Sequence, residues 1–337
     1  MRRAAAAALV LLVACSSGDD SKVAVPTSDK PTTTTTTAAP TTTSTTVAPT
    51  TTTTIPPLPA VPLDQGPPKV LATPAGFILP IEGGSPGAWQ VMTPCGVSST
   101  VHGGTTIGGA TVVLDPGHGG EETGATGPAG LVERDLNLAV AEKTKASLER
   151  QGATVVLTRT GDYRIALKTR AEIAQKLQPP VFVSIHHNGG HDEVRATPGT
   201  EVFYQHDSPT SKRLAGLLYE EEYAYFSSLP NDQWYSDRDA GAKYRLSDSG
   251  GDYYGILRRT NGVTAALSEG LFLTDPNGEA LLRTAAVQQG EADAITRAIR
   301  RFMLGNDPGS GFTEPYPRTE PAGPGGGTEG CVDPPLE

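Results

Sequence analysis

The sequence predicts an α/β fold, with a mainly parallel, twisted sheet that has helices on both of its faces. Between residues 107 and 305, apolar segments of strand length alternate with longer segments of helical periodicity. Strands separated by helices pair in parallel, and the helices then cover both faces of the sheet. The chain has 337 residues, of which 37% are hydrophobic, so we expect one substantial core and a single domain over residues 107–305.

The first half of this domain supplies three strands and two helices. The expected strands are residues 111–114, 154–158 and 181–185, and the last of these is typical of a strand buried on both faces. Residues 133–150 form the first expected helix, which carries Leu136, Val140 and Leu148 on its apolar face and ends before Gly152. Residues 164–176 form the second helix, which stops before Pro179.

The second half continues the alternation. Residues 200–204 and 263–268 are expected strands, and residues 279–304 are expected to form one long helix. Between them, residues 209–226 have helical periodicity. We expect residues 207–251 as a whole to form a solvated helix and a loop.

The N-terminus is typical of an export signal. Arg2 and Arg3 precede an apolar run over residues 4–14, which is too short to span a membrane. The run ends at Cys15 in a pattern that resembles a bacterial lipoprotein signal. In that case residues 1–15 are a signal whose cleavage leaves Cys15 as the lipid-carrying residue. The alternative is an ordinary secretory signal in which Cys15 is incidental.

The segments that flank the domain differ from it in composition. Residues 16–65 are dominated by Thr, Pro, Ala and Ser and predict a disordered stalk, which gives an anchored protein reach. Residues 66–106 carry short apolar pieces and predict a small β-rich appendage. Residues 306–337 are rich in Gly, Pro and Glu and predict a flexible tail.

The chain contains three cysteines. If Cys15 carries lipid, Cys95 and Cys331 remain, and in an oxidising exterior two remaining cysteines indicate a disulfide. It would join the segment before the domain to the tail. The alternative is two free thiols.

The charge of the chain argues against two kinds of partner. The formal net charge is −10 at pH 7, and no segment of the chain is basic overall. A surface for nucleic acid is therefore not expected, nor is one for anionic lipid.

Four residues mark a candidate site because of where they fall. His118 comes just after the first strand, His186 and Glu269 end later strands, and Glu133 begins the first helix. In an open parallel sheet, ligands bind beyond the carboxyl ends of the strands, so these side chains are expected at one edge. Two imidazoles and a carboxylate suit catalytic Zn²⁺, and a further carboxylate can accept a proton from water. Taken singly, each could instead be a surface, helix-capping or ion-pairing residue.

Five blocks in series carry a resemblance to a known family. They are residues 114–120, 124–135, 156–162, 183–188 and 267–273, which include Asp115-Pro116-Gly117-His118-Gly119-Gly120 and Ser184-Ile185-His186-His187-Asn188. From Thr111 to about Met303, the chain resembles the zinc-dependent N-acetylmuramoyl-L-alanine amidases of the cell-wall hydrolase kind. Two positions depart from the usual pattern: His187 stands where a small residue is usual, and Gly270 directly follows Glu269.

The resemblance implies roles for the residues that match. His118, Glu133 and His186 correspond to zinc ligands, and Glu269 to the catalytic carboxylate. His187, Asn188 and Asp115 are expected in the pocket or behind the ligands. The implied substrate is peptidoglycan, cut between N-acetylmuramic acid and L-alanine. We expect an exported, monomeric protein, anchored by lipid at the outer face of the cytoplasmic membrane or in the cell envelope.

Two other functions remain open at this point. One is a zinc peptidase that cuts within the stem peptide, although no cationic group for a terminal carboxylate stands beside the metal motifs. The other is a non-catalytic wall-binding lipoprotein, which would be favoured by loss of a ligand or of Glu269. A structural zinc site usually contains thiolates, and no cysteine lies near these motifs.

Overall fold

The structure is a computed structural model that describes residues 56–317, 321 and 326–337, and these residues belong to one structural unit. The expected signal peptide, Cys15 and the expected stalk up to residue 55 lie outside the described residues. In the described part of the chain, no helix is both long enough and apolar enough to cross a membrane.

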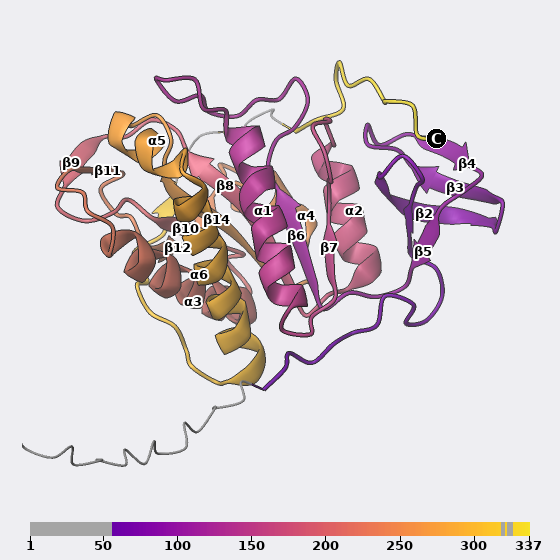
Figure 1. The fold of residues 1–337 in the computed structure, drawn as a ribbon, viewed down its shortest axis with the longest axis horizontal. Helices are drawn as coiled ribbons and strands as arrows, with labels where there is room; N and C mark the ends of the chain where they lie inside the picture. Colours follow the sequence, from indigo (N-terminus) through magenta and orange to yellow (C-terminus); the bar gives the residue numbers. More distant parts are fainter. Residues whose placement is uncertain (1–55, 318–320, 322–325) are drawn as a thin grey trace, which may run out of the picture. The chain divides into compact units, whose positions relative to one another are not determined.

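The centre of the fold is a six-stranded sheet (Figure 1). Its strands, in order across the sheet, are β12 (Ala242–Lys243), β10 (Glu201–Tyr204), β14 (Ala265–Phe272), β8 (Val181–Asn188), β6 (Val112–Pro116) and β7 (Val155–Leu157). The four strands from β14 to β7 run parallel to one another. β10 runs antiparallel to β14, and β12 is parallel to β10, so the sheet is mixed. This reversal brings Glu201, the first residue of β10, opposite Glu269.

Helices cover both faces of this sheet, which confirms the α/β class. Three helices pack on one face: α1 (Glu133–Glu149), α3 (Pro209–Ser227) and α6 (Ala285–Leu304). The other face is covered by α2 (Leu167–Leu177) and α4 (Gly255–Arg259). Within a strand, neighbouring residues face opposite cores: Leu114 packs on the α1 side and Val113 on the α2 side. Strands with apolar residues on both faces are what the near-continuous hydrophobic runs predicted.

The expectation of one long helix over residues 279–304 is wrong. The structure has α5 (Pro276–Leu282) and then α6, which begins at Ala285. The side chain of Thr284 accepts a hydrogen bond from the backbone N–H of Val287 and so caps a new helix. Asp275 caps α5 in the same way, through the N–H of Gly278 at 2.7 Å. The two capping residues were visible in the sequence, but the apolar periodicity continues across the break.

Residues 207–251 are packed into the domain to a greater extent than the sequence predicted. α3 is not a solvated helix, because Leu214, Leu217, Leu218 and Phe226 are fully buried. Glu222 is also buried, whereas Glu220 and Glu221 pair with Arg301 of α6. The remainder of the region forms three short strands, β11 (Trp234–Ser236), β12 and β13 (Arg245–Leu246), which pair with β9 (Glu193–Arg195), β10 and β15 (Tyr316–Pro317), respectively.

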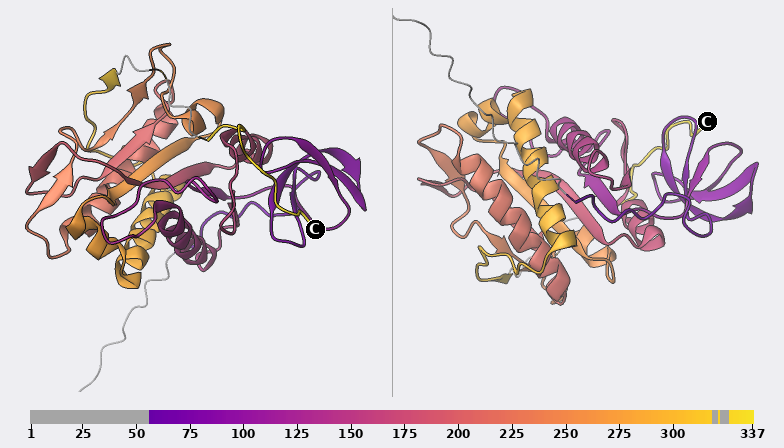
Figure 2. Two further views of the ribbon diagram at one scale, coloured as in Figure 1. Left: turned by 90° about the horizontal axis from the view of Figure 1, so that it is seen from above. Right: turned by 60° about the horizontal axis from the view of Figure 1, so that its bottom comes forward.

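Residues 66–106, expected as a β-rich appendage, carry most of a second sheet (Figure 2). It is antiparallel throughout and contains β1 (Val70–Ala72), β2 (Ile78–Ser85), β3 (Ala88–Met92), β4 (Ser98–Val101) and β5 (Thr105–Ile107). Leu71, Leu79, Val91 and Val101 form its own core. Val70, Ile78 and Ile107 instead join the core beneath α2, so the second sheet is packed against the main domain.

The folded unit begins before residue 66, where the sequence predicted the boundary between the stalk and the appendage. Leu58 is 3% exposed and belongs to the core that contains α1. Its backbone N–H donates to the carbonyl of Gln151 at 2.8 Å. The N–H of Val61 donates to the side chain of Thr111 at 2.9 Å. Residues from about 58 onward therefore belong to the folded unit, even though their composition resembles that of the stalk.

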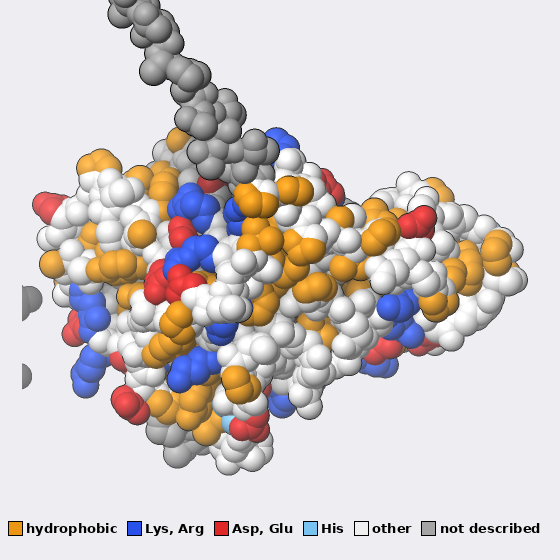
Figure 3. All heavy atoms as spheres, turned by 90° about the horizontal axis from the view of Figure 1, so that it is seen from below, with side chains coloured by type: hydrophobic (Ala, Val, Ile, Leu, Met, Phe, Trp, Pro, Cys, Tyr) orange, Lys and Arg blue, Asp and Glu red, His pale blue; other side chains and the backbone are white. Residues whose placement is uncertain are grey.

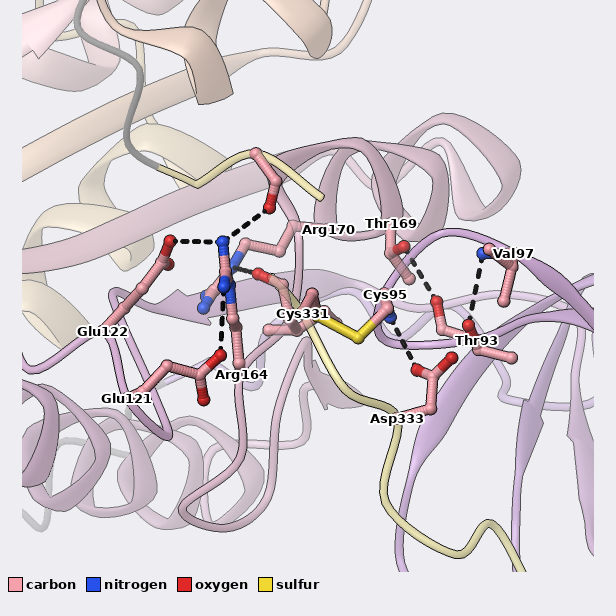
Figure 4. Close-up of a disulfide and its surroundings, with 12 residues drawn as sticks. Thr93, Cys95, Val97, Glu121, Glu122, Arg164, Thr169, Arg170, Cys331 and Asp333 are labelled. Carbon is pink, nitrogen blue, oxygen red and sulfur yellow. Dashed lines mark hydrogen bonds and ion pairs between the residues drawn. A yellow bond between two sulfur atoms is a disulfide. The ribbon is translucent and has the colours of Figure 1, made fainter. Parts of the chain in front are cut away.

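A disulfide joins Cys95 to Cys331, across 236 residues of sequence (Figure 4). The bridge expected from the cysteine count is therefore present. The side chain of Asp333 also accepts a hydrogen bond from the N–H of Cys95 at 2.8 Å. Figures 1 and 2 show the C-terminal segment running over the domain to the second sheet. Earlier in the tail, Tyr316 pairs with Arg245. The described parts of the tail are thus held to the domain at several points.

Charged side chains are intermixed on the face that Figure 3 displays. Lys and Arg side chains lie next to Asp and Glu side chains, and no large basic area is visible on the part of that face drawn in colour.

Candidate active site

The candidate site lies where the direction of the sheet's winding changes. β6 and β8 are neighbours in the sheet, but α1, β7 and α2 separate them along the chain, and α1 and α2 lie on opposite faces. Such a reversal leaves a crevice beyond the carboxyl ends of the two strands. His118 follows β6 by two residues, and His186 lies near the end of β8. The fold therefore brings both histidines to the crevice.

Three of the predicted residues meet there. Suitable ligand atoms of His118, Glu133 and His186 all lie within 4.8 Å of one another. The Nε2 of His118 is 3.2 Å from Oε2 of Glu133, and the Nδ1 of His186 is 3.0 Å from Oε1 of the same carboxylate. Two imidazoles and one carboxylate match the donor sets of catalytic zinc sites with three protein ligands. The residues present therefore fit the metal that the sequence suggested.

The backbone around His118 is held in an unusual conformation. His118 has a φ of 60°, which residues other than glycine rarely adopt. Such a conformation persists only where its surroundings enforce it, and it is frequent at functional sites. Arg170 of α2 donates to the carbonyl of His118 at 2.5 Å and to that of Pro116 at 2.7 Å. These contacts fix the turn that aims the imidazole at Glu133.

Two glycines leave the space that the cluster occupies. A Cβ at Gly117 would lie 2.1 Å from the ring of His186. A Cβ at Gly124 would lie 2.3 Å from Oε2 of Glu133 and 2.6 Å from the ring of His118. Neither clash can be relieved without moving a candidate ligand. The glycines in these motifs are thus explained by close packing around the three side chains.

The structure also separates His186 from His187. Successive residues of a strand point to opposite faces of the sheet. His186 faces the crevice, whereas His187 points towards α1 and α6 and is 1% exposed. The Nδ1 of His187 is 2.8 Å from Oδ1 of Asn137, whose amide nitrogen is 3.2 Å from Oε1 of Glu133. His187 is therefore not a pocket residue; it lies behind the cluster and reaches Glu133 through Asn137.

The ionisation of the cluster suits metal binding. Burial acts to raise the pKa of Glu133, but its contacts with the imidazoles of His118 and His186 hold that pKa well below its ordinary value. Burial lowers the pKa of His186, although the neighbouring Glu133 opposes this effect. An ionised carboxylate and a neutral imidazole are the forms that coordinate a metal ion.

Glu269 lies beside this cluster on the next strand. In the parallel pairing of β14 with β8, Glu269 is opposite His186. Burial raises the pKa of Glu269 well above its ordinary value, and the nearby carboxylates of Glu133 and Glu201 add to the effect. Its Oε2 atom is buried and has no hydrogen-bond partner within the described residues. A carboxylate with a raised pKa next to a candidate metal site is suited to accept a proton.

The two remaining predicted residues support the strand ends. Asp115 is 1% exposed and accepts hydrogen bonds from Thr158, Arg170 and Ser184. Burial acts to raise the pKa of Asp115, but these partners, Arg170 above all, hold it below its ordinary value. Asn188 donates from its side chain to Glu201. Among the described residues, neither side chain is hydrogen-bonded to the side chains of the three candidate ligands, and Asp115 acts through Arg170 on the turn of His118.

A groove of about 480 Å³ opens next to the cluster. Its lining includes His118 and His186 and, from α4 and the residues before it, Tyr253, Tyr254, Ile256, Arg258 and Arg259. Sequence reasoning missed these α4 residues, because they lie outside the five family blocks and α4 has only five residues. It also missed the buried ion pair of Glu201 and Lys243, in which Glu201 lies opposite Glu269 in the sheet. No local pattern marked either group.

Comparison with known proteins agrees with this geometry. Two curated bacterial proteins are similar to the chain. The uncharacterized protein YqiI of Bacillus subtilis is 35% identical over 220 residues, which covers 64% of this chain and 97% of that protein. The N-acetylmuramoyl-L-alanine amidase AmiA of Escherichia coli is 30% identical over 224 residues, covering 58% of this chain and 77% of the relative.

A solved structure shares the fold. Cwp6 from Clostridium difficile aligns with a TM-score of 0.51 at 29% sequence identity, over 58% of this chain and 29% of that chain. The family model described as N-acetylmuramoyl-L-alanine amidase matches residues 112–301, which span the strands and helices that bear the cluster and Glu269. With more than half of its length matched, the chain belongs to the N-acetylmuramoyl-L-alanine amidase family.

Proposed function

We propose that this chain is a zinc-dependent amidase that hydrolyses the bond between N-acetylmuramic acid and L-alanine in peptidoglycan. Membership of the amidase family supports the enzyme class and the substrate. The observation that carries the zinc assignment is the meeting of His118, Glu133 and His186 at the carboxyl edge of the sheet, with Glu269 on the adjacent strand.

His118, Glu133 and His186 would hold the metal, and the site would keep a position open for water. The chemistry that bound zinc supplies is polarisation of the scissile carbonyl and a lowered pKa of its water. Behind the ligands, Asn137 contacts the carboxylate of Glu133 and thereby fixes its orientation. Arg170 holds the His118 turn through two carbonyls.

In this proposal Glu269 moves the proton. Its carboxylate accepts a proton from the attacking water and then delivers it to the departing amino group of L-alanine. The raised pKa of Glu269 suits both steps, because the group must hold the proton between them. Its unpartnered Oε2 leaves an acceptor available for the water.

We further propose how the chain is organised around this activity. Residues 1–15 act as an export signal with lipid on Cys15, and the following Thr- and Pro-rich stalk lets the anchored enzyme reach the cell wall. The stalk ends near residue 58, where the folded unit begins. Residues 66–106 form the appendage, residues 107–305 the catalytic domain and residues 306–337 the tail. The protein acts as a monomer in the cell envelope.

A peptidoglycan digest tests the proposed activity. Purified full-length protein is compared as isolated, after chelation, after chelation with zinc restored, and as Glu269→Gln. Glu142→Gln is the matched control, because Glu142 is exposed on α1. We expect zinc-dependent release of peptides that begin with L-alanine, lost in Glu269→Gln and kept in the control. Peptides cut internally would instead identify a stem-peptide peptidase. Zinc binding without any cleavage would favour a wall-binding protein.

A further inference from the structure

The groove beside the metal cluster has one wall that nothing in the proposed chemistry uses. This wall is α4 with the two residues before it, and it ends in Arg258 and Arg259. The groove volume of about 480 Å³ lies within the usual range for small-molecule sites. Because His118 and His186 also line the groove, a molecule bound there would lie next to the reacting bond.

The acidic residues of the groove are already neutralised by other arginines. Asp115 pairs with Arg170 at 2.7 Å. Glu122 pairs with Arg164 at 3.1 Å (Figure 4). Neither carboxylate has an ion-pair contact with α4. The guanidinium groups of α4 are therefore a surplus of positive charge in the groove, although the chain as a whole has a net charge of −10.

Arg258 and Arg259 have no carboxylate partner among the residues that the structure describes. Arg258 donates to the carbonyls of Asp252 and Tyr253, the latter at 3.0 Å. Among the described residues, the side chain of Arg259 makes one long hydrogen bond, 3.4 Å from its Nη1 to the carbonyl of Gly255. The pKa of Arg259 is lowered by burial and by the neighbouring charge of Arg258, as expected when two cations lie close together without an anion.

The two guanidinium groups converge on one place. A Cβ at Gly255 would lie 2.9 Å from Nη1 of Arg259 and 3.8 Å from Nη2 of Arg258. Both guanidinium groups thus lie close to Gly255, on the side where its Cβ would be. The helix that carries them is firmly seated, because Ile256 and Leu257 are 3% and 2% exposed. Paired guanidinium groups on a rigid support are suited to hold a carboxylate through charge-assisted hydrogen bonds.

We infer that this groove receives the peptide side of the substrate and that Arg258 and Arg259 bind a carboxylate of the stem peptide. The inference rests on the proposed function. Once the muramic acid is amide-linked, the glycan side of that bond carries no carboxylate. The peptide side does carry them, including the α-carboxylate of a glutamate residue that is linked through its side chain. The cationic wall therefore distinguishes the two sides of the scissile bond.

Kinetics with two matched sets of substrates test this inference. One set is soluble muramyl peptides with all carboxylates free, and the other set has each carboxylate amidated in turn. The proteins are the full-length zinc enzyme, Arg258→Gln, Arg259→Gln and the two Arg→Lys variants. Arg297→Gln is the control, because Arg297 is a half-exposed arginine that pairs with Glu221 on the opposite face of the sheet.

We expect each Gln variant to lower kcat/KM for the free-acid substrate by about ten-fold or more, mainly through KM, since hydrogen bonds to charged groups are this strong. On the substrate in which the bound carboxylate is amidated, the kcat/KM of the Gln variants should equal that of the parent protein. On the free-acid substrate, the Lys variants should lose less kcat/KM than the Gln variants. Equal effects on every substrate, or no effect on any, would overturn the inference. A parent protein that cleaves none of the substrates would instead count against the proposed function.

Discussion

The Nε2 atom of His187 lies 3.1 Å from Oε1 of Glu291, and both side chains are fully buried between the sheet and α6. Gly270 makes the approach possible, because a Cβ there would lie 2.7 Å from Oε1 of Glu291 and 3.5 Å from Nε2 of His187. His187 and Gly270, the two positions at which the sequence analysis found departures from the family pattern, therefore lie next to each other on neighbouring strands. The missing side chain at Gly270 leaves room for the pair of His187 and Glu291.

This contact predicts the behaviour of variants at the pair. Replacing His187 by Ala removes the imidazole that contacts Glu291 and leaves this carboxylate buried next to Glu222. The replacement should lower the free energy of unfolding by about 3 to 5 kcal/mol. The double variant His187→Ala/Glu291→Leu removes both polar groups and should be less destabilised than His187→Ala. Urea denaturation measures both values. A double variant less stable than the single one would contradict the view that the unpaired charge causes the loss.

Metal content should distinguish the two adjacent histidines. His186 belongs to the cluster and His187 does not, so His186→Ala should lose stoichiometric zinc while His187→Gln keeps it. Zinc bound per chain after dialysis can be measured by elemental analysis. His118→Ala should behave like His186→Ala. Loss of zinc in His187→Gln with retention in His186→Ala would show that the assignment of the ligand is reversed.

Glu222 should make stability depend on pH. It is buried on α3, and burial, together with the charge of Glu291 on α6, raises its pKa to about 8, while a hydrogen bond from Ser268 opposes the rise. His187 of β8 is the basic group beside Glu291. Between the unfolded pKa near 4.5 and the folded pKa near 8, the folded state binds a proton that the unfolded state has lost. This group therefore lowers stability as pH rises through that window.

The variant Glu222→Gln removes this proton uptake. Relative to the parent, its stability should increase by on the order of 1 kcal/mol for each pH unit between about 5 and 8. Urea denaturation at several pH values in this range gives the difference. The exposed Glu142→Gln should show no such trend. A constant difference between Glu222→Gln and the parent across the range would mean that Glu222 is ionised in the folded protein.

The disulfide should contribute to stability even though it lies outside the catalytic chemistry. It closes a loop of 236 residues, so its reduction should lower the free energy of unfolding by about 2 to 5 kcal/mol. Thermal unfolding with and without a reductant measures the effect. The Cys95→Ser/Cys331→Ser protein is the control and should not respond to the reductant. An unchanged parent midpoint under full reduction would show that the tail is held by its other contacts alone.

The sequence by itself determined the alternation of strands and helices and singled out the side chains of the candidate site. The apolar runs that became β6, β7, β8, β10 and β14 are each long enough and apolar enough to be recognised locally. His118, Glu133, His186 and Glu269 were found because each adjoins such an element, and because the motifs around them match a family. By contrast, β12 and α4, with two and five residues, gave no periodic signal.

Only the tertiary structure decided which side chains meet. Whether His186 or His187 faces the crevice depends on the strand register, because neighbouring residues of a strand point to opposite faces. The reversal of β10, which brings Glu201 beside Glu269, depends on pairing between segments more than 60 residues apart. The surplus charge of Arg258 and Arg259 emerges only when Asp115 and Glu122 are seen to have other partners. Such contacts are non-local, so local sequence preferences do not encode them.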